Sequence, residues 1–346
     1  MSSSRKRRKA RHAQDDAPAK TSESIAMGDE LRAECARTAY MSLPHAIYKR
    51  VSRVRWSSWA FVAPALLLMA LFLVYPAVAT FVRSFFGRGR ELFGPTTKYV
   101  GLSNWTYVFT NSTMLVALRN SALWVAIFSV FTVGLGTLLA VLLDRVRYER
   151  IVKSVIFIPT AVSAVGISVI WKFIFAYRAP GMDQIGLLNA IVVHFGGQPV
   201  GWLIERPWIN NLCLIVVGIW MWTGFCMIII SAAYKNIPRP LLEAARIDGA
   251  GEWKVFRHVT LPLLAPTAAV VGTTMIVQVL KMFAIVYVMT NGNYSTEVIA
   301  NRMYKEAFNL GHYGRASTIA VVLLIVILPF MILNIRRFAA NEGGRA

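Results

Sequence analysis

The chain has 346 residues, of which 56% are hydrophobic, and its mean hydropathy is +0.52. Soluble domains average about 45–50% apolar residues, and here the excess falls in long runs, which excludes a soluble globular protein and indicates an integral membrane protein. The net charge of +20 could favour nucleic acid, but no nucleic-acid motif occurs and basic residues crowd the cytoplasmic ends of membrane helices.

Residues 1–58 form a hydrophilic tail that opens with the basic run Arg5–Arg11. We expect this tail to be largely disordered and cytoplasmic, and to attract anionic lipid headgroups. It does not have the pattern of a signal peptide, because the basic stretch is too long and the next apolar segment begins only near Trp59.

The rest of the chain contains six apolar runs long enough to cross a bilayer. The predicted spans are residues 59–82, 119–143, 151–176, 212–234, 266–290 and 316–334. Pro159 should kink the third span, and Gly134 and Gly136 offer a close-packing face on the second. Residues 339–346 form a short second tail. The pattern predicts an all-α integral membrane protein with about six transmembrane helices.

Long connections separate these spans on one side. Residues 185–195 are apolar but too short to cross, so we expect a helix along the membrane interface, with Trp202 and Trp208 as interfacial aromatics. Residues 294–315 are expected to be amphipathic and exposed. Lys and Arg are proportionally richer in the opposite loops, which predicts both termini, and the loop 235–265, on the cytoplasmic side.

The loop 235–265 is polar, rich in small residues and flanked by long apolar spans. Proline suits the first turn of a helix, so Pro238 and Pro240 favour a short helix over 240–247, ended by Asp248 and by Gly249 in a left-handed conformation. A second short helix is expected over 252–259, with Leu261 and Pro262 stopping it.

The spacing Glu-Ala-Ala, three residues, Gly, nine residues, an aliphatic, one residue, Leu-Pro resembles the cytoplasmic loop of bacterial ABC importer permeases. Val259 stands where isoleucine is usual. The alternative interpretation of this loop is an ordinary amphipathic connector between membrane helices. The resemblance implies that the loop is the coupling helix that docks on an ATPase subunit. The residues assigned to this role are Glu243, Ala244, Ala245, Asp248, Gly249, Gly251, Leu261 and Pro262.

Further elements resemble the carbohydrate branch of these permeases: 99–105, 236–238, 290–292 and 304–308. Residues 296–304 are similar to permeases of the α-glucoside type, although Asn293-Tyr294 stands where Gly-Pro is commoner. The resemblance covers residues 59–338, with a core over about 118–338, and implies the type I ABC importer permease fold in a bacterial cytoplasmic (inner) membrane. It also implies a heterodimer with a second permease, two ATPase subunits that bind ATP and Mg, and an external sugar-binding protein.

The chain carries none of the common enzyme motifs. It has no phosphate-binding Gly-rich loop followed by Lys-Ser/Thr, no His-Glu-x-x-His and no Gly-x-Ser-x-Gly, and Cys35, Cys213 and Cys226 lack metal-site spacing. We therefore predict no enzyme activity, no metal site and no cofactor in this chain. The spans carry almost no carboxylates, which disfavours an ion-coupled transporter; a membrane channel or scaffold without ATP coupling is the alternative.

A sugar path needs hydrogen-bonding groups and aromatic faces. We assign Trp222 and Phe225 of the fourth span, and Gln278, Lys281 and Met282 of the fifth, as candidates, since the last three share one face of a continuous helix. A lysine deep in the bilayer normally faces a cavity or a partner. The alternatives are a snorkelling Lys281 and ordinary helix packing for the others.

Overall fold

The computed structural model describes residues 56–88, 98–204 and 208–343, with side chains between 61 and 336. Within these ranges the chain is helical, and the one β-feature is an isolated bridge between Phe86 and Tyr99. The all-α prediction is confirmed. The tail predicted over residues 1–58 lies almost entirely outside the described residues.

The chain divides into two units, residues 1–74 and 75–346. The described part of the first unit is α2 (Trp56–Met69) followed by the π-helical turn η1 (Ala70–Val74). The helices of the second unit are α3 (Tyr75–Arg83), α4 (Ser103–Thr110), α5 (Ser112–Leu143), α6 (Glu149–Ala161), α7 (Ala164–Ile174), α8 (Leu187–His194), α9 (Ile209–Lys235), α10 (Arg239–Ile247), α11 (Glu252–Val255), η2 (Phe256–Thr260), α12 (Leu261–Leu280), α13 (Ala284–Met289), α14 (Ile299–Tyr304), η3 (Lys305–Asn309) and α15 (Tyr313–Gly343).

In the described part of the chain, five helices are long and apolar enough to cross a membrane, and the count is six if one bent pair is a single span. This count agrees with the prediction of about six transmembrane helices. The helices are Phe61–Arg83, Ser112–Leu143, Ile209–Lys235, Glu252–Leu280 and Tyr313–Arg336, and the bent pair is α6 with α7. The second span begins seven residues before the predicted Arg119, because Asn111 caps α5 by accepting from the backbone N–H of Thr113 and Met114.

The third predicted span is broken rather than kinked. α6 runs through Pro159 to Ala161, and α7 leaves it at 98°. The turn is made by Val162 and Ser163, whose ψ angles of 146° and 131° are extended. The prediction that Pro159 itself marks the bend is therefore wrong by a few residues: the helix ends only where the chain becomes extended.

The fifth predicted span is also not one helix. α12 ends at Leu280, residues 281–283 are non-helical, and α13 begins at Ala284. The N–H groups of Lys281 and Met282 bond three residues back, to Gln278 and Val279, in a tight terminal turn. Consequently Met282 turns into the core while Lys281 stays exposed, and the predicted shared face of Gln278, Lys281 and Met282 is wrong.

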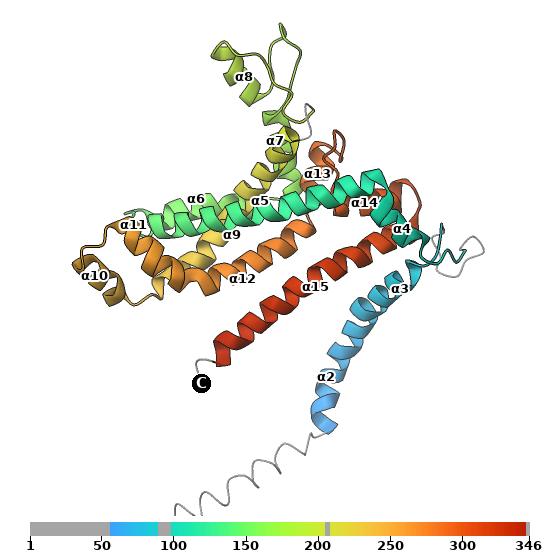
Figure 1. The fold of residues 1–346 in the computed structure, drawn as a ribbon, viewed down its shortest axis with the longest axis horizontal. Helices are drawn as coiled ribbons and strands as arrows, with labels where there is room; N and C mark the ends of the chain where they lie inside the picture. The colour runs from blue at the N-terminus through green and yellow to red at the C-terminus, as the bar shows by residue number, and fades with distance from the viewer. Residues whose placement is uncertain (1–55, 89–97, 205–207, 344–346) are drawn as a thin grey trace, which may run out of the picture. The chain divides into compact units, whose positions relative to one another are not determined.

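α5 is the central helix of the second unit, packed along α9 and α12, while α6 packs on α9 and α15 on α12 (Figure 1). Glycines allow the closest approaches. A Cβ at Gly136 would lie 2.6 Å from Cβ of Cys226, whereas Gly134 has nothing within 4 Å. The predicted close-packing face is thus confirmed at Gly136 and absent at Gly134. A Cβ at Gly224 of α9 would lie 2.4 Å from the carbonyl oxygen of Ile156 in α6.

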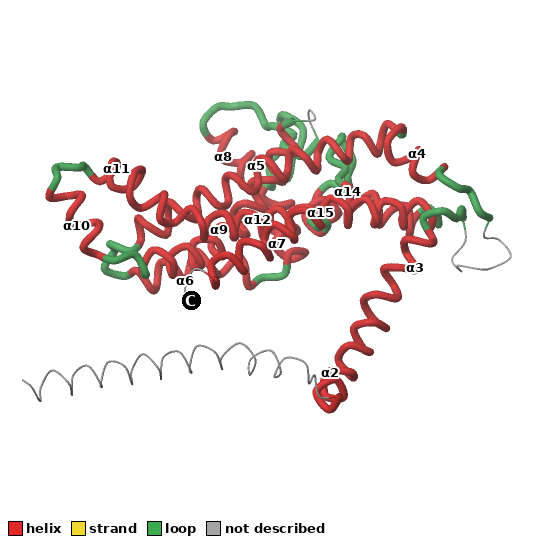
Figure 2. The backbone as a smooth tube through the Cα atoms, turned by 60° about the horizontal axis from the view of Figure 1, so that its bottom comes forward, coloured by secondary structure: helices red, strands yellow, loops and turns green. Residues whose placement is uncertain are grey.

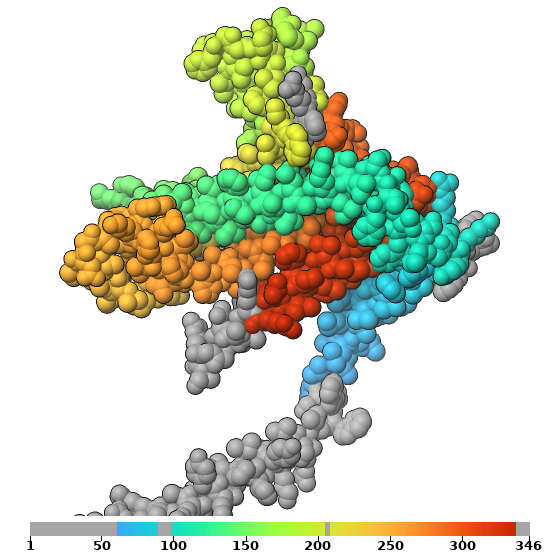
Figure 3. Space-filling model, viewed as in Figure 1, coloured from blue at the N-terminus to red at the C-terminus, as the bar shows by residue number. Residues whose placement is uncertain are grey.

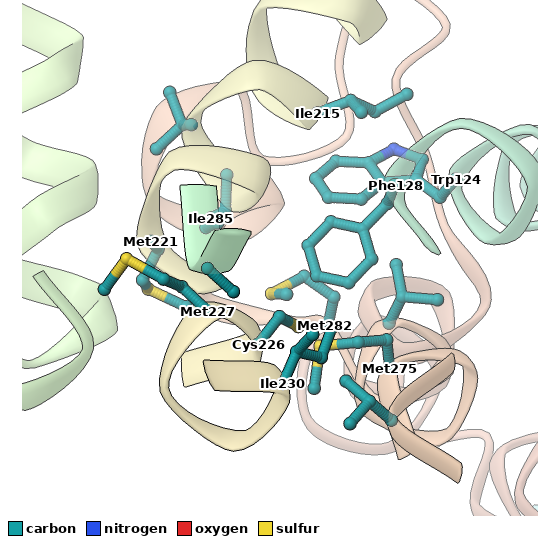
Figure 4. Close-up of a cluster of buried hydrophobic side chains, with 14 of the residues drawn as sticks. Trp124, Phe128, Ile215, Met221, Cys226, Met227, Ile230, Met275, Met282 and Ile285 are labelled. Carbon is teal, nitrogen blue, oxygen red and sulfur yellow. The ribbon is translucent and has the colours of Figure 1, made fainter. Parts of the chain in front are cut away.

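The core lies where α5, α9 and α12 meet (Figure 4). Trp124 and Phe128 of α5 are buried against Met227 and Ile230 of α9 and Met275 of α12. Met282 and Ile285, on either side of the start of α13, belong to the same cluster. Met282 therefore anchors the break after α12 to the core.

The connection between α13 and α15 differs from its prediction as an exposed amphipathic segment. Thr296, Glu297, Asn301 and Glu306 are at most 3% exposed. Charged partners explain how carboxylates can be buried there: Lys305 lies 2.9 Å from Glu297, and Arg302 lies 2.5 Å from Glu306. Sequence hydropathy does not reveal this pairing.

Candidate functional site

The loop between α9 and α12 folds as two short helices at one end of the second unit, far from α4 (Figure 2). α10 has Pro238 at its N-cap and Pro240 in its first turn. Its end is a Schellman motif, in which Gly249 N–H bonds to the Arg246 carbonyl at 3.0 Å and Ala250 N–H to that of Ala245 at 3.1 Å. Gly249 has φ +80°, so the predicted left-handed bend is confirmed.

Two buried aliphatic residues anchor this loop to the helices. Leu242 of α10 is 8% exposed and Val255 of α11 is 2% exposed. The opposite surface is open: Glu243, Ala244 and Asp248 are exposed, and Ala245 is half-buried. In the space-filling view, the loop forms one extremity of the second unit (Figure 3). It therefore offers a surface that another protein can contact.

The exposed surface combines apolar side chains with an uncommitted carboxylate. Ile247 is 85% exposed and Trp253 is 66% exposed. Among the described residues, no basic side chain pairs with Glu243. Exposed apolar surface rimmed by polar residues can mark a contact with a protein or a membrane.

Ion pairs that the sequence does not reveal tie this loop to the rest of the bundle. Glu252 accepts from Arg246 Nε at 2.9 Å and from Arg145 Nη2, and the Glu252 contact raises the pKa of Arg145. Arg145 lies in the α5–α6 turn, 107 residues away in sequence. A cavity of about 630 Å³ lies between this turn, the end of α9 and α10. One carboxylate thus links α10 and α11 to the end of α5.

The second helix of the loop does not end before Leu261 and Pro262. α11, η2 and α12 continue from Glu252 to Leu280, and Pro262 occupies the second position of α12. The predicted stop is wrong because the π-helical turn η2 precedes the proline and leaves its missing N–H without consequence. Gly251 is the N-cap of α11, with φ −63°, and a Cβ at this position would have nothing within 4 Å.

Of the candidate path residues, only Lys281 is exposed. Trp222 and Phe225 of α9 face each other edge to face at 5.7 Å and pack against the core cluster. Gln278 is half-buried in the last turn of α12, Met282 is buried, and Lys281 is exposed at the helix break. The structure therefore brings Trp222 and Phe225 together and separates Lys281 from Met282.

A buried polar cluster follows α13, and sequence reasoning missed it. Glu306 accepts from Tyr107 Oη at 2.6 Å and lies 2.9 Å from His312 Nδ1. Its burial opposes ionisation, but the hydrogen bonds from Tyr107 and His312 and the charge of Arg302 leave the pKa of Glu306 below its ordinary value. This carboxylate fixes the chain between α14 and α15 against α4.

The sequence matches a known family over most of its apolar part. Residues 132–338 match the family described as binding-protein-dependent transport system inner membrane component. The osmoprotective compounds uptake permease protein GgtC of Synechocystis sp. is 54% identical over 283 residues, which are 82% of this chain and 99% of that protein. The alpha-glucoside transport system permease protein AglF of Rhizobium meliloti is 45% identical over 287 residues, 83% of each chain.

The fold matches solved structures as well. A chain of a bacterial ABC transporter that imports the acidic polysaccharide alginate superposes with a TM-score of 0.68 at 22% identity, covering 84% of this chain and 99% of that one. The alginate transporter in complex with its pentasaccharide-bound periplasmic protein gives a TM-score of 0.69, also at 22% identity. The likeness shows that this chain has an ABC importer permease fold, as predicted.

Proposed function

The chain belongs to the family of binding-protein-dependent transport system inner membrane components, and we propose that this permease imports an α-glucoside or another oligosaccharide. The observation that supports this choice of cargo is the 45% identity with an alpha-glucoside permease over 83% of both chains. The relative that is 54% identical takes up osmoprotective compounds, which makes an osmoprotective solute the second candidate cargo.

We infer the partners from the family and from the loop. The family description names a binding protein, and the alginate transporter has been solved with a periplasmic one. By analogy, this permease pairs with a second permease in a heterodimer, with two ATPase subunits inside and a sugar-binding protein outside. ATP and Mg would bind to the ATPase subunits. The complex would lie in a bacterial inner membrane, with both termini of this chain in the cytoplasm.

The loop geometry supports a proposal for how this chain contributes to coupling. When the ATPases close on ATP, they would push on α10, where Glu243 is free to pair with a basic group or a helix terminus of the ATPase. Gly249 keeps the bend between α10 and α11, and Leu242 and Val255 carry the displacement into the helices. The path between the two permeases would then open to alternate sides of the membrane.

The test is to purify the tagged chain with its partners and reconstitute the complex into liposomes. We expect an ATPase subunit to co-purify, and ATP inside the vesicles to drive uptake of labelled maltose, sucrose or trehalose. Glycine betaine serves as the osmoprotective comparison. Uptake of glycine betaine alone would reject the sugar cargo. Recovery of the intact permease pair without an ATPase would favour the channel or scaffold alternative.

A further inference from the structure

A second cavity, of about 470 Å³, lies between α7, α13 and the loop that follows α13, on the half of the unit away from α10 (Figure 1). It takes no part in the coupling proposed above. Five of its lining residues can bind a polar ligand: Lys172, Tyr287, Asn291, Asn293 and Tyr294. We call it the α13 cavity. None of its described lining residues is an Asp or a Glu.

These five side chains have the chemistry that a sugar ring requires. Tyr287 is 36% exposed and Tyr294 is 56% exposed, so aromatic surface is available for stacking. The side-chain amides of Asn291 and Asn293 are exposed and have no hydrogen-bond partner among the described residues. Each amide can both donate and accept, as neighbouring sugar hydroxyls do. Lys172 gives one N–H to the Val288 carbonyl at 3.2 Å, which leaves two donors.

The loop that carries three of these residues has a strained backbone. Asn291, Tyr294 and Ser295 have φ angles of 51°, 54° and 61°, a region that residues other than glycine seldom adopt. Buried amides hold the strained conformation: Asn210 donates to the Tyr294 carbonyl and Asn120 to that of Ser295, both at 2.7 Å. Strain that the surroundings enforce is typical of ligand-binding sites, where it fixes groups before the ligand arrives.

The ring of Tyr287 is held in place as well. It stacks on Phe283 with centroids 4.8 Å apart and meets Tyr304 edge to face at 5.2 Å. Phe283 ends the break after α12, so the same segment leads from Lys281 to the cavity. A fixed aromatic ring beside uncommitted amides loses little conformational entropy when a ligand binds.

We propose that the α13 cavity is a carbohydrate subsite that holds a sugar ring of the cargo on its way to the central path. The ring stacks on Tyr287 or Tyr294, its hydroxyls bond to Asn291 and Asn293, and Lys172 donates to a further hydroxyl. The volume falls within the range of about 300–1,000 Å³ of small-ligand pockets. The proposal rests on the sugar cargo proposed above. It goes further by naming the site at which that cargo first binds this chain, outside the candidate path.

The first test measures transport by the complete complex in proteoliposomes, with labelled maltose and sucrose as probes. Tyr287→Leu keeps much of the bulk of the side chain but loses the aromatic face. We expect the sugar concentration for half-maximal uptake to rise about tenfold, with complex yield and sugar-free ATPase rate unchanged. Tyr287→Phe should stay within about twofold of wild type, since the ring remains. Tyr99→Leu, at a tyrosine 73% exposed outside the cavity, is the matched control.

The second test reports on binding directly. Asn293→Cys, in a complex whose three native cysteines in this chain are replaced by serine, is labelled with a membrane-impermeant maleimide. Maltose or sucrose should slow the labelling, and mannitol at the same osmolarity should not. Protection by sodium sulfate and by neither sugar would make the cavity an anion site at Lys172 and overturn the proposal.

The outcomes separate the two proposals. Wild-type uptake of maltose or sucrose, with Tyr287→Leu behaving like Tyr99→Leu and no sugar protection at position 293, rejects the subsite and leaves the sugar importer standing. Absence of sugar uptake by the wild-type complex, together with absence of protection, rejects the sugar cargo and the subsite with it.

Discussion

At the scale of single residues, two neighbouring glycines of the loop have different reasons to be there. Gly249 follows the end of α10 and has φ +80°. This left-handed conformation is strongly unfavourable for a β-branched residue. Gly251 has φ −63° and open space around it. The spacing of the sequence motif does not separate these roles, but backbone geometry does.

The pair gives a matched prediction. Gly249→Val should place about 1–2 kcal/mol of strain in the bend, so that the protein inserts normally while sugar-stimulated ATPase activity falls several-fold. Gly251→Ala should keep wild-type stimulation. The measurement is stimulated ATPase activity of the reconstituted complex at equal permease content. Equal activity in both variants would show that coupling does not require the bend at Gly249.

The surroundings of Lys281 differ from those that the sequence predicts. It lies at the end of α12, exposed, rather than within a continuous span. If it donates to sugar or gates the path, Lys281→Met should reduce uptake while the ATPase still co-purifies, since methionine keeps the length but removes the donors. Undiminished uptake at matched membrane levels would leave Lys281 with a structural role only.

At the scale of elements, close helix contacts determine which substitutions the bundle tolerates. Gly224→Ala would put a Cβ 2.4 Å from the Ile156 carbonyl and force α6 away from α9. We expect a loss of about 1–3 kcal/mol in the free energy of unfolding. Gly134→Ala, on an open face of α5, should be neutral or slightly stabilising. Thermal unfolding of the detergent-solubilised protein compares the two, and equal midpoints would contradict this packing.

Periodicity and hydropathy predicted the spans and the two-helix loop because long apolar runs and Pro/Gly signals are local features. They failed where tertiary contacts decide. The break at Lys281 depends on Met282 packing into the core, and the burial of Glu306 depends on Tyr107 and Arg302. The Arg145–Glu252 pair joins segments far apart in sequence. None of these pairings leaves a periodic signal in the chain.

At the scale of the whole molecule, coupling to a cytoplasmic ATPase requires one orientation in the membrane. Single cysteines at Tyr99 and Gly197, both exposed, should react with an impermeant maleimide in intact cells. Cysteines at Arg147 and Gly251, also exposed, should react only after permeabilisation. Labelling of the Gly251 position in intact cells would contradict the proposed coupling, because a cytoplasmic ATPase could not reach the loop.

We propose that ATP hydrolysis by partner subunits drives sugar uptake through the contact at Glu243. The most direct measurement is ATP-dependent uptake of the transported sugar by reconstituted complexes carrying wild-type chain or Glu243→Lys, with Arg147→Glu as a control charge change at an exposed residue near the same end. We predict that Glu243→Lys loses the ATPase subunit or its coupled activity, while Arg147→Glu transports normally. Wild-type uptake and ATPase stimulation in Glu243→Lys would show that the contact at Glu243 does not couple ATP hydrolysis to uptake.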